Sequence, residues 1–164
     1  MKQDAKITVL QQNKIEKMLT CKKPYSITLA GKKICVEPGV FYPASDTKLL
    51  IALFIAPRAN KTIATDINPK AVHNIQTNIR AHKLGTKMKA IHANLFPSGK
   101  EKFDVIVINP PYTDKKATNF AEQSMWDEKH SAVKRFFKKA KNYLKPKGRI
   151  YSTWANFADF TLFE

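Results

Sequence analysis

The sequence predicts an α/β fold with an open sheet of parallel strands, and three strand-like segments lead to this prediction. Residues 103–108 contain five apolar residues among six, which is typical of a parallel strand buried on both faces. Residues 61–66 are expected to form a second buried strand that ends in an acid, and a helix with an apolar stripe is expected to start at Pro69. Residues 88–92 form a third, shorter strand. In open α/β sheets the chemistry lies at the carboxyl ends of the strands.

The tetrapeptide Asn109-Pro110-Pro111-Tyr112 directly follows the first of these segments. Two prolines stiffen the turn and remove two backbone donors, so its carbonyl groups remain free to accept hydrogen bonds. Asn109 adds a side-chain acceptor and Tyr112 an aromatic face. The turn therefore predicts a slot for a flat group with N–H donors, such as a side-chain amide or the exocyclic amine of a base. The alternative is a simple strand end, since Asn and Pro are common in turns.

This motif resembles that of the class I, S-adenosylmethionine-dependent N-methyltransferases. The resemblance implies a doubly wound, mostly parallel, Rossmann-like sheet, with S-adenosylmethionine as cofactor and a planar nitrogen as methyl acceptor. It implies that Asn109 and Pro110 hold the target nitrogen, with Pro111 in the same turn, and that Tyr112 stacks on the substrate. Positioning of the nitrogen would then supply most of the catalysis.

Two strand ends carry the expected cofactor residues. A carboxylate at the end of residues 61–66 can accept both hydroxyls of a ribose, although a lone acid there is also a common helix cap. The resemblance assigns Asp66, with the adjacent Ile67, to the cofactor ribose. It assigns Asn94 and Leu95 to the adenine. The family usually has an acid where Asn94 stands, and an uncharged amide predicts weaker binding there.

The segment at residues 39–47 extends the resemblance. Gly39-Val40-Phe41-Tyr42-Pro43, followed by Asp46-Thr47, is similar to the loop before the catalytic motif in HemK-like methyltransferases, which modify glutamine in translation release factors. The resemblance implies that Phe41 and Thr47 contact the cofactor. Related base methyltransferases have similar loops, so the segment does not choose a substrate, and a plain aromatic turn is the alternative.

Two parts of the family pattern are missing from the sequence. Between Leu49 and Asp66 the family has a first strand and a glycine-rich loop, but this interval contains no glycine. Residues 50–55 could form that central strand, its neighbours could pair directly, or the strand and loop are absent from the sequence. The sequence also ends at Glu164, before the two strands that complete the family's sheet.

The remaining elements follow from periodicity. An N-terminal helix over residues 4–19 and a β-hairpin over residues 25–36 are expected before the sheet. We expect a substrate-entry region at residues 1–45 and a truncated methyltransferase domain at residues 46–164. The apolar stripe of the N-terminal helix comprises Ile7, Leu10, Ile15, Met18 and Leu19.

The C-terminal third predicts a lid, a helix and a strand. Residues 113–126 are polar and irregular enough for a substrate lid, anchored by Met125 and Trp126 at its end. A helix over about residues 129–144 should end at Pro146-Lys147-Gly148, and a strand should follow over residues 149–154.

The charge of the chain indicates an anionic partner. Lys and Arg number 29 against 13 Asp and Glu, a net charge of +16, so RNA or DNA is an expected partner beside a release factor. Solubility is the alternative reason for the charge. Without the glycine-rich loop, the chain could instead be a non-catalytic, basic nucleic-acid-binding module.

Location and metal binding follow from composition. No apolar run is long enough for a membrane span, and the first residues do not form a secretion signal, which predicts a cytoplasmic protein. Cys21 and Cys35 lack the spacing of a metal site, so no metal site is expected. Two cysteines without such spacing suggest a reducing, intracellular environment.

Overall fold

The structure is a computed structural model that describes residues 2–29, 31–41, 59–155, 158 and 161. The chain divides into two compact units, Met1–Asn94 and Leu95–Glu164. The predicted boundary between residues 45 and 46 lies outside the described residues, as do Thr47 and most of the interval between Leu49 and Lys61.

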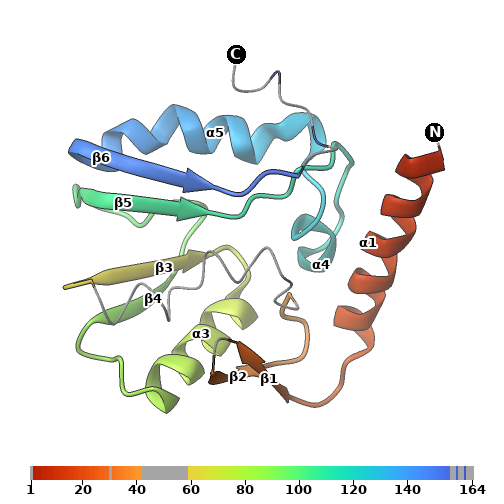
Figure 1. Cartoon of the computed structure of the whole chain (residues 1–164), viewed down its shortest axis with the longest axis horizontal. Coiled ribbons are helices and arrows are strands. Elements are labelled where there is room, and N and C mark those ends of the chain that lie inside the picture. Colours follow the sequence, from red (N-terminus) through yellow and green to blue (C-terminus); the bar gives the residue numbers. More distant parts are fainter. Residues whose placement is uncertain (1, 30, 42–58, 156–157, 159–160, 162–164) are drawn as a thin grey trace. The chain divides into compact units, whose positions relative to one another are not determined.

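The first unit contains two strand pairs and two described helices (Figure 1). As the sequence predicts, an antiparallel hairpin and two parallel strands are present, and residues at the carboxyl ends of the parallel strands are paired, Asp66 with His92. The elements are α1 (Lys2–Thr20), β1 (Tyr25–Leu29), β2 (Lys32–Val36), β3 (Thr62–Asp66), α3 (Pro69–Ala81) and β4 (Met88–His92).

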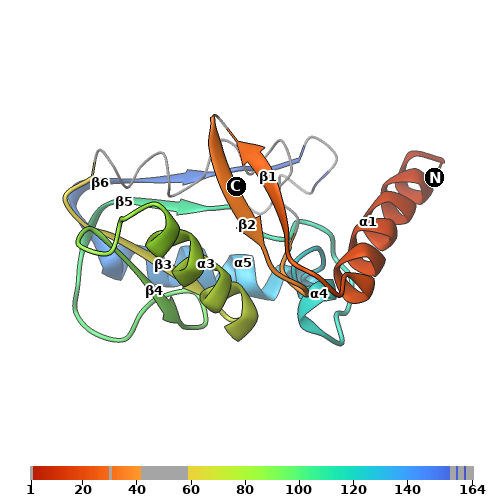
Figure 2. The same cartoon turned by 90° about the horizontal axis from the view of Figure 1, so that it is seen from below.

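Helix α3 connects β3 to β4 and contacts both strands and β2 (Figure 2). The helix starts at Pro69, as predicted, and the structure adds a cap: the side chain of Asn68 accepts from the Lys70 N–H at 3.0 Å. Ile79 and Met88 form a buried cluster between helix and strand. Apolar burial therefore fixes α3 on the strand pair.

The apolar stripe predicted for α1 is only partly correct. Ile15 and Met18 are buried together with Gln11, at spacings of four and three, so these residues share one helix face. Leu10 and Leu19 lie off that face and are 55% and 61% exposed. Among the described residues, no helix is long and apolar enough to cross a membrane.

The second unit is built on a parallel strand pair with one long helix. The register runs from Val105 opposite Arg149 to Ile108 opposite Ser152. Phe96 stacks on Tyr143 with ring centroids 4.4 Å apart and forms part of the aromatic core. The elements are β5 (Phe103–Ile108), α4 (Phe120–Gln123), the short 3-10 helices η2 (Glu128–His130) and η3 (Lys141–Tyr143), α5 (Ser131–Ala140) and β6 (Leu144–Ser152).

The predicted bounds of the last helix and strand are wrong. Helix α5 ends at Ala140, and β6 already begins at Leu144, so residues 146–148 belong to the strand. The strand register shifts between Phe103 and Val105, which leaves extra residues of β6 as an irregularity that accommodates Pro146. A Cβ at Gly148 would lie 2.9 Å from the Lys145 carbonyl oxygen, so this glycine serves a close backbone approach.

Candidate functional site

Asn109 begins the turn at the carboxyl end of β5, where the neighbouring strand fixes its side chain. The N–H of Thr153 donates to the Ile108 carbonyl oxygen at 3.2 Å, which continues the ladder beyond β6. The Thr153 hydroxyl donates to Oδ1 of Asn109 in a very short hydrogen bond. A carbonyl oxygen has two lone pairs, so Oδ1 can accept a second donor. Thr153 was predicted only as a strand residue, and its role depends on the parallel pairing.

Aromatic rings lie beside the same turn. Tyr112 meets the ring of Trp154 edge to face, with centroids 6.0 Å apart and planes at 72°. The ring of His130 lies 6.2 Å from Trp154 on a tilted plane. Pro110 is buried, whereas Asn109 and Tyr112 are half-buried. The turn is thus rigid and lined by aromatic faces, as a site for a flat group requires.

The segment predicted as an irregular lid is more ordered than expected. It contains α4, and its two ends meet in a bridge between Thr113 and Trp126. Met125 and Trp126 are buried, which confirms them as anchors. The ammonium group of Lys115 lies 3.8 Å from the centre of the Trp126 ring, a cation–π contact. The segment is therefore a closed loop fastened at its base.

Asp127 connects this loop to α5 and escaped the sequence prediction. Its N–H donates to the Thr113 carbonyl oxygen at 2.9 Å. Its buried carboxylate accepts from the Ser131 hydroxyl at 3.0 Å and from the N–H groups of Ala132 and Val133 at 2.9 and 3.1 Å. The N–H groups of Ala132 and Val133 belong to the first turn of α5, where N–H groups lack helical partners and a negative charge is favourable.

In the first unit, Asp66 ends β3 with its carboxylate held by backbone. Oδ1 accepts from the Asn68 N–H at 2.8 Å. Burial raises the pKa of Asp66 above its ordinary value of 3.8, although the N–H groups of Asn68 and Ile67 act in the opposite direction. The other carboxylate oxygen retains acceptor capacity, so the group is suited to hydroxyl donors.

Asn94 follows the end of β4, which is paired with the end of β3. The Ala93 N–H donates to the Asp66 carbonyl oxygen at 3.0 Å, so the residue before Asn94 is bonded to the end of β3. Nε2 of His92 donates to the Ile67 carbonyl oxygen at 2.9 Å. Asn94 is exposed, and Leu95 has a left-handed backbone with φ of 75°. Asp66, Ile67 and Asn94 are thus gathered at one edge of the strand pair, and Leu95 follows directly in sequence.

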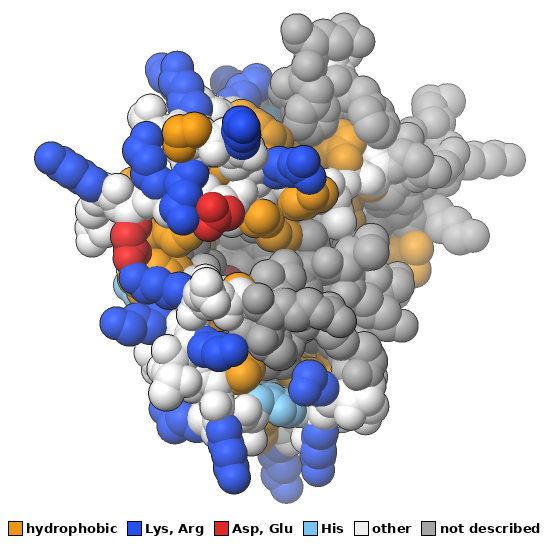
Figure 3. Space-filling model, turned by 60° about the vertical axis from the view of Figure 1, so that its left-hand side comes forward, with side chains coloured by type: hydrophobic (Ala, Val, Ile, Leu, Met, Phe, Trp, Pro, Cys, Tyr) orange, Lys and Arg blue, Asp and Glu red, His pale blue; other side chains and the backbone are white. Residues whose placement is uncertain are grey.

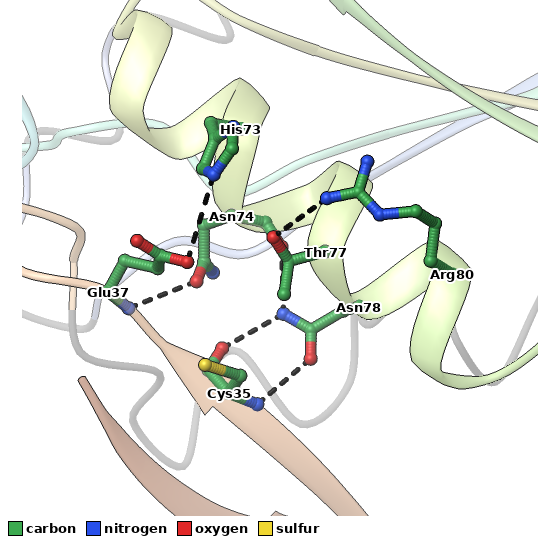
Figure 4. Close-up of polar contacts among 7 residues, drawn as sticks. All are labelled: Cys35, Glu37, His73, Asn74, Thr77, Asn78 and Arg80. Atoms are coloured by element: carbon green, nitrogen blue, oxygen red, sulfur yellow. Dashed lines mark hydrogen bonds and ion pairs between the residues drawn. The ribbon is translucent and has the colours of Figure 1, made fainter.

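Buried asparagines of α3 hold the backbone of β2 and of the loop after it (Figure 4). Asn78 accepts from the Cys35 N–H through Oδ1 and donates to the Cys35 carbonyl oxygen through Nδ2, both at 2.9 Å. Asn74 accepts from the Glu37 N–H at 3.0 Å. These side chains bond the edge of β2 that β1 does not use, and so protect it.

Asn68 continues this series to the loop itself. Its Nδ2 donates to the Gly39 carbonyl oxygen at 3.2 Å. Gly39 has φ of 74°, and a Cβ there would lie 3.3 Å from the Lys70 side chain. The loop is therefore fastened beside the turn that carries Asp66, and Phe41, half-buried, lies two residues farther along. The sequence did not predict the asparagine contacts, because an amide does not reveal a partner some 40 residues away.

Positive charge covers much of the described surface. Lys and Arg side chains outnumber acidic ones on the face shown in Figure 3. Helix α5 exposes a row of cations opposite its buried Val133, Phe136 and Ala140, as its spacing predicts. These cations are Lys134, Arg135, Lys138 and Lys139, and exposed Lys141 follows at the start of η3.

Comparison with known proteins identifies relatives of the chain. The family described as "Methyltransferase small domain" matches residues 50–161. A putative protein N5-glutamine methyltransferase of Methanocaldococcus jannaschii is 28% identical over 153 residues, covering 76% of each chain. A release factor glutamine methyltransferase of Borreliella burgdorferi is 38% identical over 68 residues, which cover 42% of this chain.

A solved structure shows the same fold. A 16S rRNA N2 methyltransferase of T. thermophilus, in complex with AdoMet and guanosine, matches with a TM-score of 0.63 and 18% identity over 85% of this chain. This similarity confirms the predicted Rossmann-like α/β fold. The chain spans 44% of that structure and 23% of the Borreliella burgdorferi protein.

Proposed function

This chain belongs to the methyltransferase small domain family, and we propose that it transfers a methyl group from S-adenosylmethionine to a planar nitrogen. The observation that carries the proposal is the Asn-Pro-Pro-Tyr turn at the end of β5, in which Thr153 fixes the Asn109 side chain. The relatives named above are methyltransferases, which disfavours the alternative of a non-catalytic binding module.

The turn acts by positioning the target nitrogen. Oδ1 of Asn109 and the carbonyl oxygen of Pro110 accept its N–H groups, while Pro111 keeps the turn stiff. Tyr112 supplies a face on which the flat group rests, supported edge to face by Trp154. With its N–H groups held, the nitrogen lone pair has a fixed direction, and a fixed attack direction accounts for much of a rate enhancement.

Most of the expected cofactor residues belong to the first unit, whereas Leu95 is the first residue of the second. The Asp66 carboxylate, fixed by the Asn68 N–H, accepts ribose hydroxyls beside Ile67, and Asn94 and Leu95 border the adenine. When bound, S-adenosylmethionine supplies a methyl group activated by its sulfonium. Phe41 and Thr47 are further cofactor contacts expected from the sequence, and the loop that carries Phe41 is held by Asn68.

A glutamine side-chain amide of a translation protein is the leading substrate. The names of the relatives from Methanocaldococcus jannaschii and Borreliella burgdorferi support this choice, since both specify glutamine. The exocyclic amine of an RNA base is the second candidate, favoured by the net charge of +16. Both groups are flat and both donate N–H.

Transfer of labelled methyl groups tests the proposal. The protein is incubated with tritiated S-adenosylmethionine and either a purified translation release factor or 16S rRNA, with Asn109→Ala as the inactive control. Label on a release-factor glutamine, located by mass spectrometry, supports the leading substrate, whereas label on RNA alone selects the second. No label above the control on either substrate would contradict the proposed function.

A further inference from the structure

His130 is a buried polar residue whose ring neighbour, Trp154, also contacts Tyr112 of the proposed substrate turn. His130 is only 7% exposed, and its Nδ1 has no hydrogen-bond partner among the described residues. Buried nitrogen atoms in folded proteins are normally hydrogen-bonded, because leaving water without a new partner destabilises the folded chain. This atom therefore calls for a partner beyond the described part of the chain.

The backbone at this position is strained as well. Lys129 and His130 have φ of 55° and 51°, in the left-handed region that residues other than glycine seldom adopt. The turn is held by a bond from the His130 N–H to the Asp127 carbonyl oxygen at 2.9 Å, and by a bond from the Lys129 N–H to Oδ1 of Asp114 at 2.7 Å. Strain that the surrounding structure enforces is typical of functional sites.

His130 also shares a neighbour with the substrate turn. The ring of Trp154 lies 6.2 Å from that of His130 and 6.0 Å from that of Tyr112. All three residues belong to the second unit. His130 and Tyr112 therefore belong to one cluster of rings centred on Trp154.

The chemistry of an amide substrate leaves one group for His130 to bind. A glutamine amide presents two N–H donors and one carbonyl acceptor. Asn109 and Pro110 offer acceptors for the donors, but Pro110 and Pro111 have no N–H, so neither proline can donate to the amide carbonyl. An N–H at Nδ1 of His130 meets that need.

We propose that His130 is a substrate-positioning residue whose Nδ1 donates a hydrogen bond to the carbonyl oxygen of the target glutamine amide. The inference rests on the proposed function with its leading substrate. Because this bond holds the amide equally before and during transfer, its loss is expected to change substrate affinity more than turnover.

The test compares His130→Phe with His130→Asn. Phe keeps a ring but removes the nitrogen, so we expect the Kd for a fluorescein-labelled release-factor peptide to rise about tenfold, the effect of one hydrogen bond. Asn tolerates the left-handed backbone and keeps a donor near the position of Nδ1, so its Kd should stay near that of the wild type. If the larger ring of Phe prevents folding, His130→Leu serves in its place.

Lys129→Gly is the matched control. It relieves the same kind of backbone strain at an exposed residue and keeps the N–H bonded to Asp114, so peptide affinity should not change.

A lower Tm for His130→Phe with unchanged Kd would show a structural role and overturn the inference, as would equal effects of Phe and Asn. A wild type that binds the peptide but methylates nothing contradicts the proposed function, and the affinity comparison still decides the role of His130. Binding of an RNA oligonucleotide in place of the peptide would also overturn it.

Discussion

Asn109 is the residue on which the proposed reaction depends most. Asn109→Ala removes an acceptor for the target nitrogen but leaves the first unit unchanged. We therefore expect kcat to fall about a hundredfold, since the loss falls on the transition state, with the Kd for S-adenosylmethionine unchanged. Steady-state kinetics and calorimetry measure the two quantities. Ser152→Ala, at an exposed neighbouring position, is the control, and an unchanged kcat for Asn109→Ala would remove this residue from the mechanism.

Asp66 links cofactor binding to stability. Its pKa is raised by burial, so the folded chain binds this proton more tightly than the unfolded chain does. The free energy of unfolding therefore falls as pH rises from 3.8 through the raised pKa, and ionised Asp66 destabilises the protein at pH 7. Asp66→Asn should raise the free energy of unfolding at pH 7, with no gain below pH 3.8.

Asp66→Asn should also weaken cofactor binding by about 1.5 to 3 kcal/mol, the range for hydrogen bonds to a charged group. Urea unfolding at several pH values and calorimetry give both measurements. Higher stability with undiminished cofactor affinity would show that Asp66 does not bind the ribose.

At the scale of elements, α3 is joined to the hairpin by Asn78. Asn78→Ala removes both hydrogen bonds to Cys35, so the N–H and carbonyl oxygen of Cys35 lose these partners. We expect the free energy of unfolding to fall by about 2 to 4 kcal/mol. Thr77→Ala is the control, because Thr77 only accepts a 3.3 Å bond from exposed Arg80, and it should change stability little. Equal urea midpoints for the two variants would contradict this account of the hairpin.

Sequence patterns predicted elements whose cause is local. Three strand-like segments give β3, β4 and β5, and the start of α3 follows from Pro69. Residues 144–148 were misassigned, because the strand irregularity that accepts Pro146 and Gly148 depends on the partner strand.

The site shows the same limit. The tetrapeptide at residues 109–112 identified the turn, and the resemblance it carries is confirmed by the family match. Thr153 and Trp154 were not predicted as site residues, since only the pairing of β6 with β5 brings them to the turn. The sequence likewise did not reveal that the ring of His130 lies near that of Trp154. The assigned roles of the predicted site residues stay predictions.

The net charge of the whole molecule makes a prediction about RNA. With +16, binding to RNA should weaken steeply with salt, since each phosphate contact releases counterions; on single strands log K falls by about 0.7 per contact for each unit of log salt. Filter binding between 50 and 200 mM salt, about the range over which such losses are large, measures the slope. An affinity for RNA that does not change with salt concentration would show that the positive charge serves another purpose, and it would favour a protein substrate.

The central claim is that this chain binds S-adenosylmethionine, and isothermal titration calorimetry with that cofactor tests it most directly. The protein used for this measurement includes the interval from Leu49 to Lys61, which contains no glycine. Binding with micromolar Kd, weakened in Asp66→Asn, is the expected result. No heat of binding at millimolar cofactor would contradict the claim and favour a non-catalytic module.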